Sequence, residues 1–328
     1  MEIKELSFKE AMRQALQEEM KADPQVVVMG QDVRKNGGSL GITLGLEEKF
    51  GEDQLMDTPS SEQAVVGTAA GAAMTGLRPV VELGSMDQAL LAFGELAHGA
   101  ARPFYWSRGK VKVPMTVIIP IGGGDNPQNG QALENLFAHI SGLKVVEPSN
   151  AAQGKGLLKA AIRDDNPVVF LVNRDLLNIK SQVPVEDSYI LPLGKSYTER
   201  KGGSVTIVAW GAALVSVLEA AVVLEQDGVR AEVINPMTLA PLDMDPIFQS
   251  VKKTGHLLIV HDENKTGGMG AEISASVAES PVFDYLEAPI FRLCGLDVPM
   301  PYSKGLEDVM TPKAEDVIQS VYDLLGVD

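Results

Sequence analysis

Short, uninterrupted apolar runs recur along the first half of this sequence, and they constrain its fold more than any other feature. Between them lie stretches with helical spacing, such as residues 6–21, where the apolar positions repeat at the period of a helix. Strands that are apolar on both faces are typical of parallel sheets, and their alternation with helices builds right-handed βαβ units. The runs are VVVMG (26–30), RPVVEL (78–83), VPMTVIIPIG (113–122), KVVEPS (144–149) and PVVFLV (167–172). The first half is therefore predicted to be an α/β domain with a parallel sheet.

The pattern stops in a polar connector, residues 173–200, and then resumes. We place a domain boundary in this connector, which gives domains of residues 1–185 and 186–328. The second set of strand-like runs is VTIVAWG (205–211), AEVINP (231–236), HLLIVHD (256–262) and APIFRL (288–293). The fold class is thus α/β, with two doubly wound domains of which the second is the smaller.

Composition excludes several classes of function. The chain has 328 residues and a net charge of −16, and no cluster of Lys and Arg could neutralise phosphates, so no nucleic-acid partner is expected. No apolar run is long enough to span a bilayer, so no membrane partner is expected either. A single cysteine, Cys294, cannot form an intrachain disulfide and fits a reducing compartment. We therefore expect a cytoplasmic protein.

The stretch DTPSSEQAVVGTAAGAAMTG (57–76) combines turn chemistry with a helix of small residues. Pro59 disfavours helical backbone before it, so the helix should begin just after it, with Ser60 or Ser61 as the N-cap. Glu62 is the only acid in the helical run. It could simply complement the helix dipole, or it could hold a proton shared with a ligand packed against the small residues. Spacing alone leaves both interpretations open.

This stretch and the following LRPVVEL resemble the signature DTP-x-SE…G-x-A-x-G…G-x-RP-V-E of one enzyme family. That family is the beta subunits of the thiamine diphosphate-dependent component of 2-oxoacid dehydrogenase complexes (pyruvate, branched-chain and acetoin type). The similarity continues in order through VPMTVIIPIGGG (113–124), LFAHISGLKVVEPS (136–149), GLLKAAIRDDNPVVFL (156–171), LPLGK (191–195), TLAPLD (238–243), VHDENKTGGMGAEI (260–273) and APIFRLCGLDVPMPY (288–302). The resemblance implies an N-terminal pyrimidine-binding domain and a C-terminal domain like that of transketolase.

The resemblance also implies a shared active site. In this family an alpha subunit grips the diphosphate through Mg²⁺ with a GDG…N motif, which this sequence lacks, and the two chains form an α2β2 heterotetramer. Glu62 matches the glutamate that hydrogen-bonds the aminopyrimidine and activates the coenzyme. Ser60, Gly84 and Gln88 match positions beside the cofactor. The substrate would be a small 2-oxoacid or acyloin, and a lipoyl acyltransferase core could dock on the acidic C-terminal domain.

Three positions depart from the family pattern. Asn129-Gly130-Gln131 stands where the family has His-Ser-Gln, Gln88 stands where many relatives have an aromatic residue, and Met237 stands where they often have arginine. An asparagine amide can hydrogen-bond a substrate, but it cannot move protons as an imidazole does. These departures keep two alternatives open: a split transketolase-like carboligase subunit, and a non-catalytic, divergent beta subunit.

Two further sites follow from the resemblance. His139 matches a family histidine at the end of its helix, and we favour a catalytic role near the active site, or a role at a subunit interface, over a plain helix cap. The segment AAIRDDNPV (160–168) matches a potassium site built from carbonyls of Ala161, Ile162 and Asp164 near Asn166. A helix end followed by a DN-P turn needs no ion, so a structural potassium remains one of two interpretations.

Overall fold

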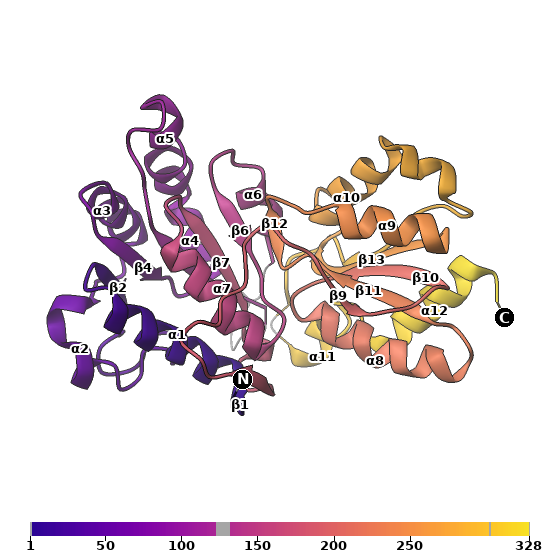
Figure 1. Ribbon diagram of the computed structural model, residues 1–328, viewed down its shortest axis with the longest axis horizontal. Coiled ribbons are helices and arrows are strands. Elements are labelled where there is room, and N and C mark those ends of the chain that lie inside the picture. Colours follow the sequence, from indigo (N-terminus) through magenta and orange to yellow (C-terminus); the bar gives the residue numbers. More distant parts are fainter. Residues whose placement is uncertain (1, 123–131, 302, 328) are drawn as a thin grey trace. The chain divides into compact units, whose positions relative to one another are not determined.

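The computed structural model describes residues 2–122, 132–301 and 303–327, and the chain divides into two compact units (Figure 1). The first unit comprises Met1–Gln131 and Leu136–Leu193, and the second comprises Ala132–Asn135 and Gly194–Asp328. Two α/β units, the second smaller, confirm the fold class expected from the sequence.

The first unit extends past residue 185, where the sequence placed the boundary, because the next residues are fastened to a helix. Leu191 donates its N–H to the carbonyl of Gly156 (3.2 Å), and a Cβ on Gly156 would lie 2.7 Å from the Leu191 Cγ. The buried ammonium of Lys159 bonds the carbonyl of Asp187 (2.6 Å). The polar composition of residues 186–193 is typical of a connector. Nevertheless, the backbone of Gly156 and the ammonium of Lys159 bind this segment to the first unit.

The sheet of the first unit contains six parallel strands in the order β6-β7-β5-β4-β2-β3. Their bounds are β2 (Val26–Gly30), β3 (Leu55–Asp57), β4 (Arg78–Glu82), β5 (Thr116–Ile121), β6 (Lys144–Val146) and β7 (Val168–Asn173). Gly30 pairs with both Asp57 and Glu82, so β2, β3 and β4 end at the same edge. That edge is the place where open α/β sheets bind ligands.

Helices cover this sheet, and α1 packs against α7. The helical period of residues 6–21 predicted a helix, and α1 covers most of this stretch, beginning after a capping box formed by Ser7 and Glu10. The helical bounds are α1 (Phe8–Ala22), α2 (Glu47–Gln54), α3 (Glu62–Met74), α4 (Met86–Leu91), a π-helix η1 (Glu95–Ala100), α5 (Pro103–Trp106), α6 (Glu134–Ala138), α7 (Ala151–Arg163) and a 3₁₀ turn η2 (Arg174–Leu176). α3 packs on β4 and on η1.

The second unit has a five-stranded sheet in the order β14-β13-β10-β11-β9. All pairings are parallel except that of β9 with β11. The strands are β9 (Tyr197–Arg200), β10 (Val205–Ala209), β11 (Ala231–Asn235), β13 (Leu257–Asn264) and β14 (Phe291–Gly295), and a short β12 (Thr238–Ala240) follows β11. Figure 1 shows α9 and α10 on one face of this sheet and α8 and α12 on the other, which is the doubly wound arrangement.

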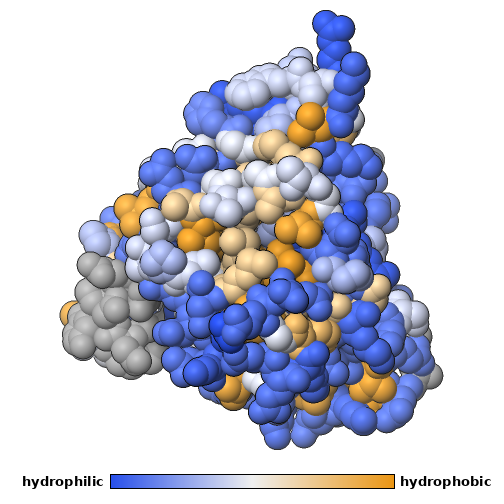
Figure 2. Space-filling view, turned by 90° about the vertical axis from the view of Figure 1, so that its left-hand side faces the viewer, coloured by the Kyte–Doolittle hydropathy of each residue, from blue (hydrophilic) through white to orange (hydrophobic). Residues whose placement is uncertain are grey.

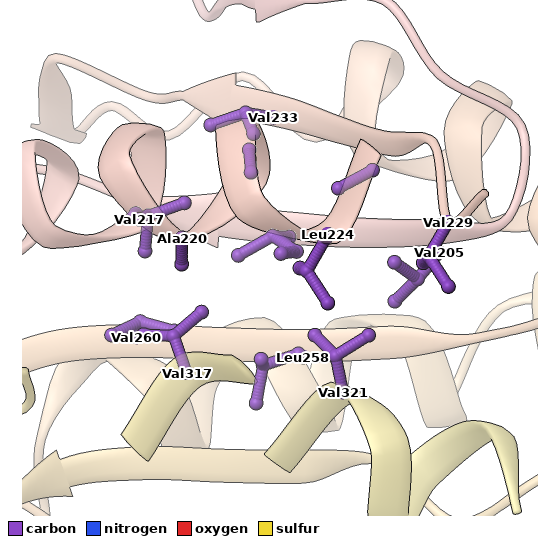
Figure 3. Close-up of a cluster of buried hydrophobic side chains, with 14 of the residues drawn as sticks. Val205, Val217, Ala220, Leu224, Val229, Val233, Leu258, Val260, Val317 and Val321 are labelled. Atoms are coloured by element: carbon purple, nitrogen blue, oxygen red, sulfur yellow. The ribbon is translucent and has the colours of Figure 1, made fainter. Parts of the chain in front are cut away.

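The core of the second unit lies between its sheet and the pair α8 and α12. Figure 3 shows Val217 and Leu224 of α8 and Val317 and Val321 of α12 directed toward the strands. All four are buried, so each adds about 1.5–3 kcal/mol of hydrophobic stabilisation. The helical bounds are α8 (Ala213–Gln226), α9 (Asp245–Thr254), α10 (Met269–Ala278), a 3₁₀ segment η3 (Pro281–Tyr285), α11 (Lys304–Glu307) and α12 (Ala314–Leu325).

The connector at 173–200 contains short strands that the sequence analysis did not predict. β8 (Lys180–Pro184) pairs with β1 (Ile3–Ser7), and β9 is the edge strand of the second sheet. Neither strand is buried on both faces, so each carries polar residues and lacks the continuous apolar pattern of the central strands. Within the described residues, no helix is both long enough and apolar enough to cross a membrane.

Candidate active site

Glu62 is the first residue of α3 and lies at the ligand-binding edge of the first sheet. The turn that precedes it leaves β3, and Thr58 anchors this turn by donating its N–H to the carbonyl of Gly30 (2.9 Å). Only 8% of Glu62 is exposed. Its carboxylate Oε1 accepts a hydrogen bond from the Ser60 hydroxyl (3.2 Å). A buried carboxylate therefore opens a helix that carries no other charge.

The serines do not cap α3 as the sequence analysis expected. Ser61 is the N-cap residue, but its side chain makes no capping bond. The Ser60 hydroxyl donates its hydrogen bond to the Glu62 carboxylate instead. The carboxylate is thus oriented by a neighbouring hydroxyl.

A small pocket lies against Glu62, and its cavity volume of about 10 Å³ is room for about one water molecule, so a larger group would extend out of it. Its walls come from the ends of β2 and β4, the turn after β3 and the first turn of α3. The lining residues are Gln31, Thr58, Pro59, Ser61, Glu62, Val65, Glu82, Leu83 and Gly84. Two of these side chains are carboxylic acids and none is basic. The pocket therefore suits a small group that donates hydrogen bonds and has apolar faces, and it does not suit a diphosphate.

Glu82, the second acid of this pocket, was not predicted from the sequence. It is 4% exposed, and its Oε1 accepts hydrogen bonds from the Ser39 hydroxyl and the Leu40 N–H, both 2.9 Å. Its Oε2 has no hydrogen-bond partner in the described part of the chain. Burial raises the pKa of Glu82 to about 6, although the bonds from Leu40 and Ser39 and the charge of Arg174 oppose that rise.

The fold that buries Glu82 depends on a distant loop. Gly38 has a left-handed φ of +72°, and a Cβ there would collide with the Glu82 carboxylate. Only glycine allows the loop to close over this strand end. The only signal in the sequence was that Glu82 follows the apolar residues of RPVVEL. An acid in that position is equally typical of the exposed end of a strand.

Gly84 and Gln88 lie together at the other side of the pocket. Gly84 lines the pocket, and a Cβ added to it would collide with the Gln88 side chain. Gln88 is half-buried in the first turn of α4, where its N–H bonds the capping Ser85 hydroxyl (3.3 Å). Arg174 donates to the Gly84 carbonyl (2.6 Å). The four residues predicted to contact the cofactor, Ser60, Glu62, Gly84 and Gln88, thus occupy one region of the first unit.

Of the other two predicted catalytic residues, the structure describes only His139. Asn129 lies outside the described residues. His139 is exposed in the turn after α6, and it is not among the residues that line the pocket. Its role in catalysis stays a prediction.

The carbonyls of the predicted potassium site already accept hydrogen bonds. Those of Ile162 and Asp164 accept from one guanidinium nitrogen of Arg78 (3.1 Å each), and that of Ala161 accepts from the Asp164 N–H (3.2 Å). The Asp164 carboxylate accepts from Asn166 (3.1 Å to its amide nitrogen) and from Lys144. The helix end and turn are therefore satisfied within the chain, as the ion-free interpretation requires. Among the described residues, no group of three or more acidic, histidine or cysteine side chains could hold a metal ion.

Two family models match the chain, one in each unit. The pyrimidine-binding domain of transketolase matches residues 4–180, and the C-terminal domain of transketolase matches residues 194–317. These matches agree with the two domain types that the resemblance implied.

Curated relatives match over nearly the whole chain. The beta subunit of the mitochondrial pyruvate dehydrogenase E1 component of Caenorhabditis elegans is 43% identical over 98% of this chain and 93% of its own length. The corresponding subunit of Chaetosphaeridium globosum is 43% identical over 97% of this chain and 98% of its own length. That of Rhizobium meliloti (strain 1021) is 40% identical, covering 98% and 70%.

Solved structures share the fold. A split-gene transketolase, described as an inactive beta4 tetramer, superposes with a TM-score of 0.81 at 23% identity and covers 98% of this chain and 99% of its own. A transketolase of Pichia stipitis in complex with xylulose 5-phosphate gives a TM-score of 0.69 at 14% identity, and the chain spans 46% of it. At these identities the likeness concerns the fold alone.

Proposed function

Because the chain belongs to the family of pyruvate dehydrogenase E1 component beta subunits, we propose that it provides the pyrimidine-binding half of a thiamine diphosphate site acting on pyruvate or a close 2-oxoacid. The observation that carries this proposal is the buried Glu62 carboxylate, which lies beside a second buried acid in a pocket without any basic side chain. Family membership makes the enzyme a thiamine diphosphate-dependent oxidoreductase component. The substrate itself is part of the proposal.

The side chains that line the pocket suit the chemistry of one part of the coenzyme and not that of the other. An aminopyrimidine is flat and carries N–H groups, which Glu62 would accept, while Val65, Pro59 and Leu83 would pack on the ring. When bound, thiamine diphosphate supplies the carbanion chemistry of decarboxylation. Glu62 would hydrogen-bond a nitrogen of the ring and would transfer a proton at that nitrogen. Ser60 would orient the Glu62 carboxylate. Ser60, Gly84 and Gln88 complete our proposed cofactor contacts.

The diphosphate requires another chain. Among the described residues, no basic side chain lines the pocket, so we assign the diphosphate and Mg²⁺ to an alpha subunit in an α2β2 heterotetramer. The exposed face of α3 supports such a partner: Ala64, Thr68 and Gly71 lie on it, and none is charged. Figure 2, which shows this side of the first unit, has a broad band of pale and orange surface between blue regions. Small side chains on this face allow a partner helix to approach closely.

Further parts of the proposal rest on the sequence. Asn129 would hydrogen-bond the substrate in place of the family histidine, and His139 would act near the site. A lipoyl acyltransferase with a basic docking surface would receive the acyl group from a protein whose net charge is −16. The single cysteine supports a cytoplasmic location. We leave potassium out of the proposal, because Arg78 and the Asp164 N–H already bond its expected carbonyl ligands.

The test is co-production with the alpha subunit, followed by purification with thiamine diphosphate and Mg²⁺. The complex should reduce a dye acceptor with pyruvate or a related 2-oxoacid, and either chain alone should not. Turnover of ketose donors with aldehyde acceptors, and none of 2-oxoacids, would favour the split carboligase. An assembled, cofactor-bound complex inactive in both assays would contradict the proposal and favour a non-catalytic subunit.

A further inference from the structure

Three neighbouring aromatic side chains project from the first unit into solvent. They belong to α5 and are 44% (Phe104), 85% (Tyr105) and 63% (Trp106) exposed. We call residues 102–112 the aromatic tip. Aromatic residues bury 150–250 Å² each when covered, so leaving three of them exposed forgoes a large hydrophobic gain. An exposed apolar cluster of this kind marks an interaction site.

The aromatic tip is rigid, because its own backbone holds it. Ser107 donates its N–H to the Pro103 carbonyl (2.9 Å), Gly109 donates to the Phe104 carbonyl (2.7 Å), and Val111 donates to the Ser107 hydroxyl (2.8 Å). Arg108 is held at a left-handed φ of +58°, which non-glycine residues adopt at a cost of about 1–3 kcal/mol. A preorganised loop loses little entropy when it binds a partner.

A hollow of about 720 Å³ lies against the aromatic tip and has a single wall. In the described part of the chain, all the residues that line it come from positions 104–109, and they include Arg108 and the three aromatics. A small-molecule site encloses most of its ligand. A hollow with one wall cannot do so, and its occupant must provide the remaining walls. This geometry fits another protein.

Charge indicates what that protein presents. No acidic residue occurs between Glu95 and Asp125, whereas Arg102, Arg108, Lys110 and Lys112 all fall in this interval and are exposed. Arg102 lies over the Trp106 ring at 5.7 Å, and Lys112 pairs with Asp165 (2.5 Å). Within the described residues, Arg108 and Lys110 have no ion pair. The aromatic tip is thus a basic point on a strongly acidic chain.

We propose that the aromatic tip anchors an acidic segment of the alpha subunit, one in which carboxylates flank an apolar side chain that enters the hollow. The inference rests on the proposed function, because the alpha subunit is its premise. Trp, Tyr and Arg are the residues that dominate the binding energy of protein interfaces. The basic charge of the aromatic tip favours a partner segment that carries carboxylates, and the alpha subunit is the partner that the proposed function requires.

The experiment measures the dissociation constant between the chain and the alpha subunit by sedimentation, with thiamine diphosphate and Mg²⁺ present. Trp106→Ala and Tyr105→Ala should each weaken association at least about tenfold, the usual effect of losing an anchor residue. The double variant Arg108→Glu, Lys110→Glu should also weaken association with the alpha subunit. This effect should be larger at low salt than at high salt, because salt screens the interaction between charges. The melting temperature of each isolated variant should match that of the wild type, because these side chains are exposed.

Tyr285→Ala is the matched control. Tyr285 is 50% exposed on η3 of the second unit and also has a cation, Lys252, over its ring at 5.7 Å. Its loss should change the dissociation constant less than twofold.

Wild-type affinity in the Trp106→Ala and Tyr105→Ala complexes would overturn the inference and leave the proposed function intact. Self-association of the chain alone that depends on Trp106 would overturn the assignment to the alpha subunit. Failure of the wild-type chain to bind any alpha subunit would instead overturn the proposed function.

Discussion

The ends of the parallel strands differ sharply between the two units. In the first unit, two buried acids, Glu62 and Glu82, meet a pocket. In the second unit, His261 on β13 is fully buried and stacks on Trp210, with ring centroids 5.0 Å apart and planes 16° from parallel. A Cβ on Gly270 of α10 would lie 2.6 Å from the His261 Nε2. One sheet edge is open to a ligand, and the other is filled by an aromatic stack.

At each edge, burial favours the neutral form of one ionisable group, Glu82 in the first unit and His261 in the second. Burial raises the pKa of Glu82 to about 6, and burial, assisted by the positive charge of Arg292, lowers the pKa of His261 to about 3. Neither His261 ring nitrogen has a hydrogen-bond partner in the part of the chain that the structure describes. A perturbed pKa is therefore insufficient to identify an active site. The feature that distinguishes the edge of the first unit is the pocket beside Glu82.

The largest expected effect concerns Glu62. Glu62→Gln should lower the turnover of the assembled complex by about 10²–10⁴-fold, because the amide accepts a hydrogen bond but cannot move a proton. The control is Glu232→Gln in the second unit, which alters a carboxylate of equal exposure (8%) that pairs with Lys253. We expect turnover within about twofold of wild type for it. A similar loss of turnover in both variants would contradict the view that only the first unit's sheet edge takes part in catalysis.

The second prediction concerns the stability of the second unit in acid. His261 has a folded-state pKa well below its usual 6.5, so the unfolded state binds the proton first as the pH falls. The free energy of unfolding should therefore drop by about 1.4 kcal/mol for each pH unit below 6.5. His261→Phe should flatten this slope in urea unfolding at pH 7.5, 6.5 and 5.5. An unchanged slope would show that the imidazole accepts a proton in the folded protein.

The third prediction has the opposite sign and concerns the first unit. Glu82 has a folded-state pKa above its usual 4.5, so the folded state binds the proton more tightly. Its contribution to stability is greatest below pH 4.5 and is lost as the pH rises through 6, by about 2 kcal/mol in total. Glu82→Gln should remove this part of the pH dependence. A wild-type titration of unfolding free energy that matches the variant between pH 5 and 7 would contradict it.

The smallest effect is expected for potassium. Arg78 and the Asp164 N–H already donate hydrogen bonds to the carbonyls at the end of α7. Replacing K⁺ with Na⁺ should therefore shift the melting temperature by less than about 1 °C. A clear stabilisation that saturates with K⁺ would show that an ion binds there. Such a result would restore the site at Ala161, Ile162, Asp164 and Asn166.

The central strands were predictable because burial on both faces requires continuous apolar runs. The edge strands β8 and β9 were not predictable, since exposed strands carry no such run. Glu62 was found through its motif, whereas Glu82 was missed. The residues that bury Glu82 come from the loop at 38–40, which is more than forty positions away in the sequence. No local pattern records such a contact.

The proposed proton transfer by Glu62 can be measured without any substrate. In the assembled complex, exchange of the coenzyme's C2 proton for deuterium can be followed by quenching and NMR. We expect Glu62→Gln to slow this exchange by at least about 10²-fold while the alpha subunit and thiamine diphosphate remain bound. Exchange at the wild-type rate in that variant would contradict the account, because the carboxylate would then have no part in activating the coenzyme.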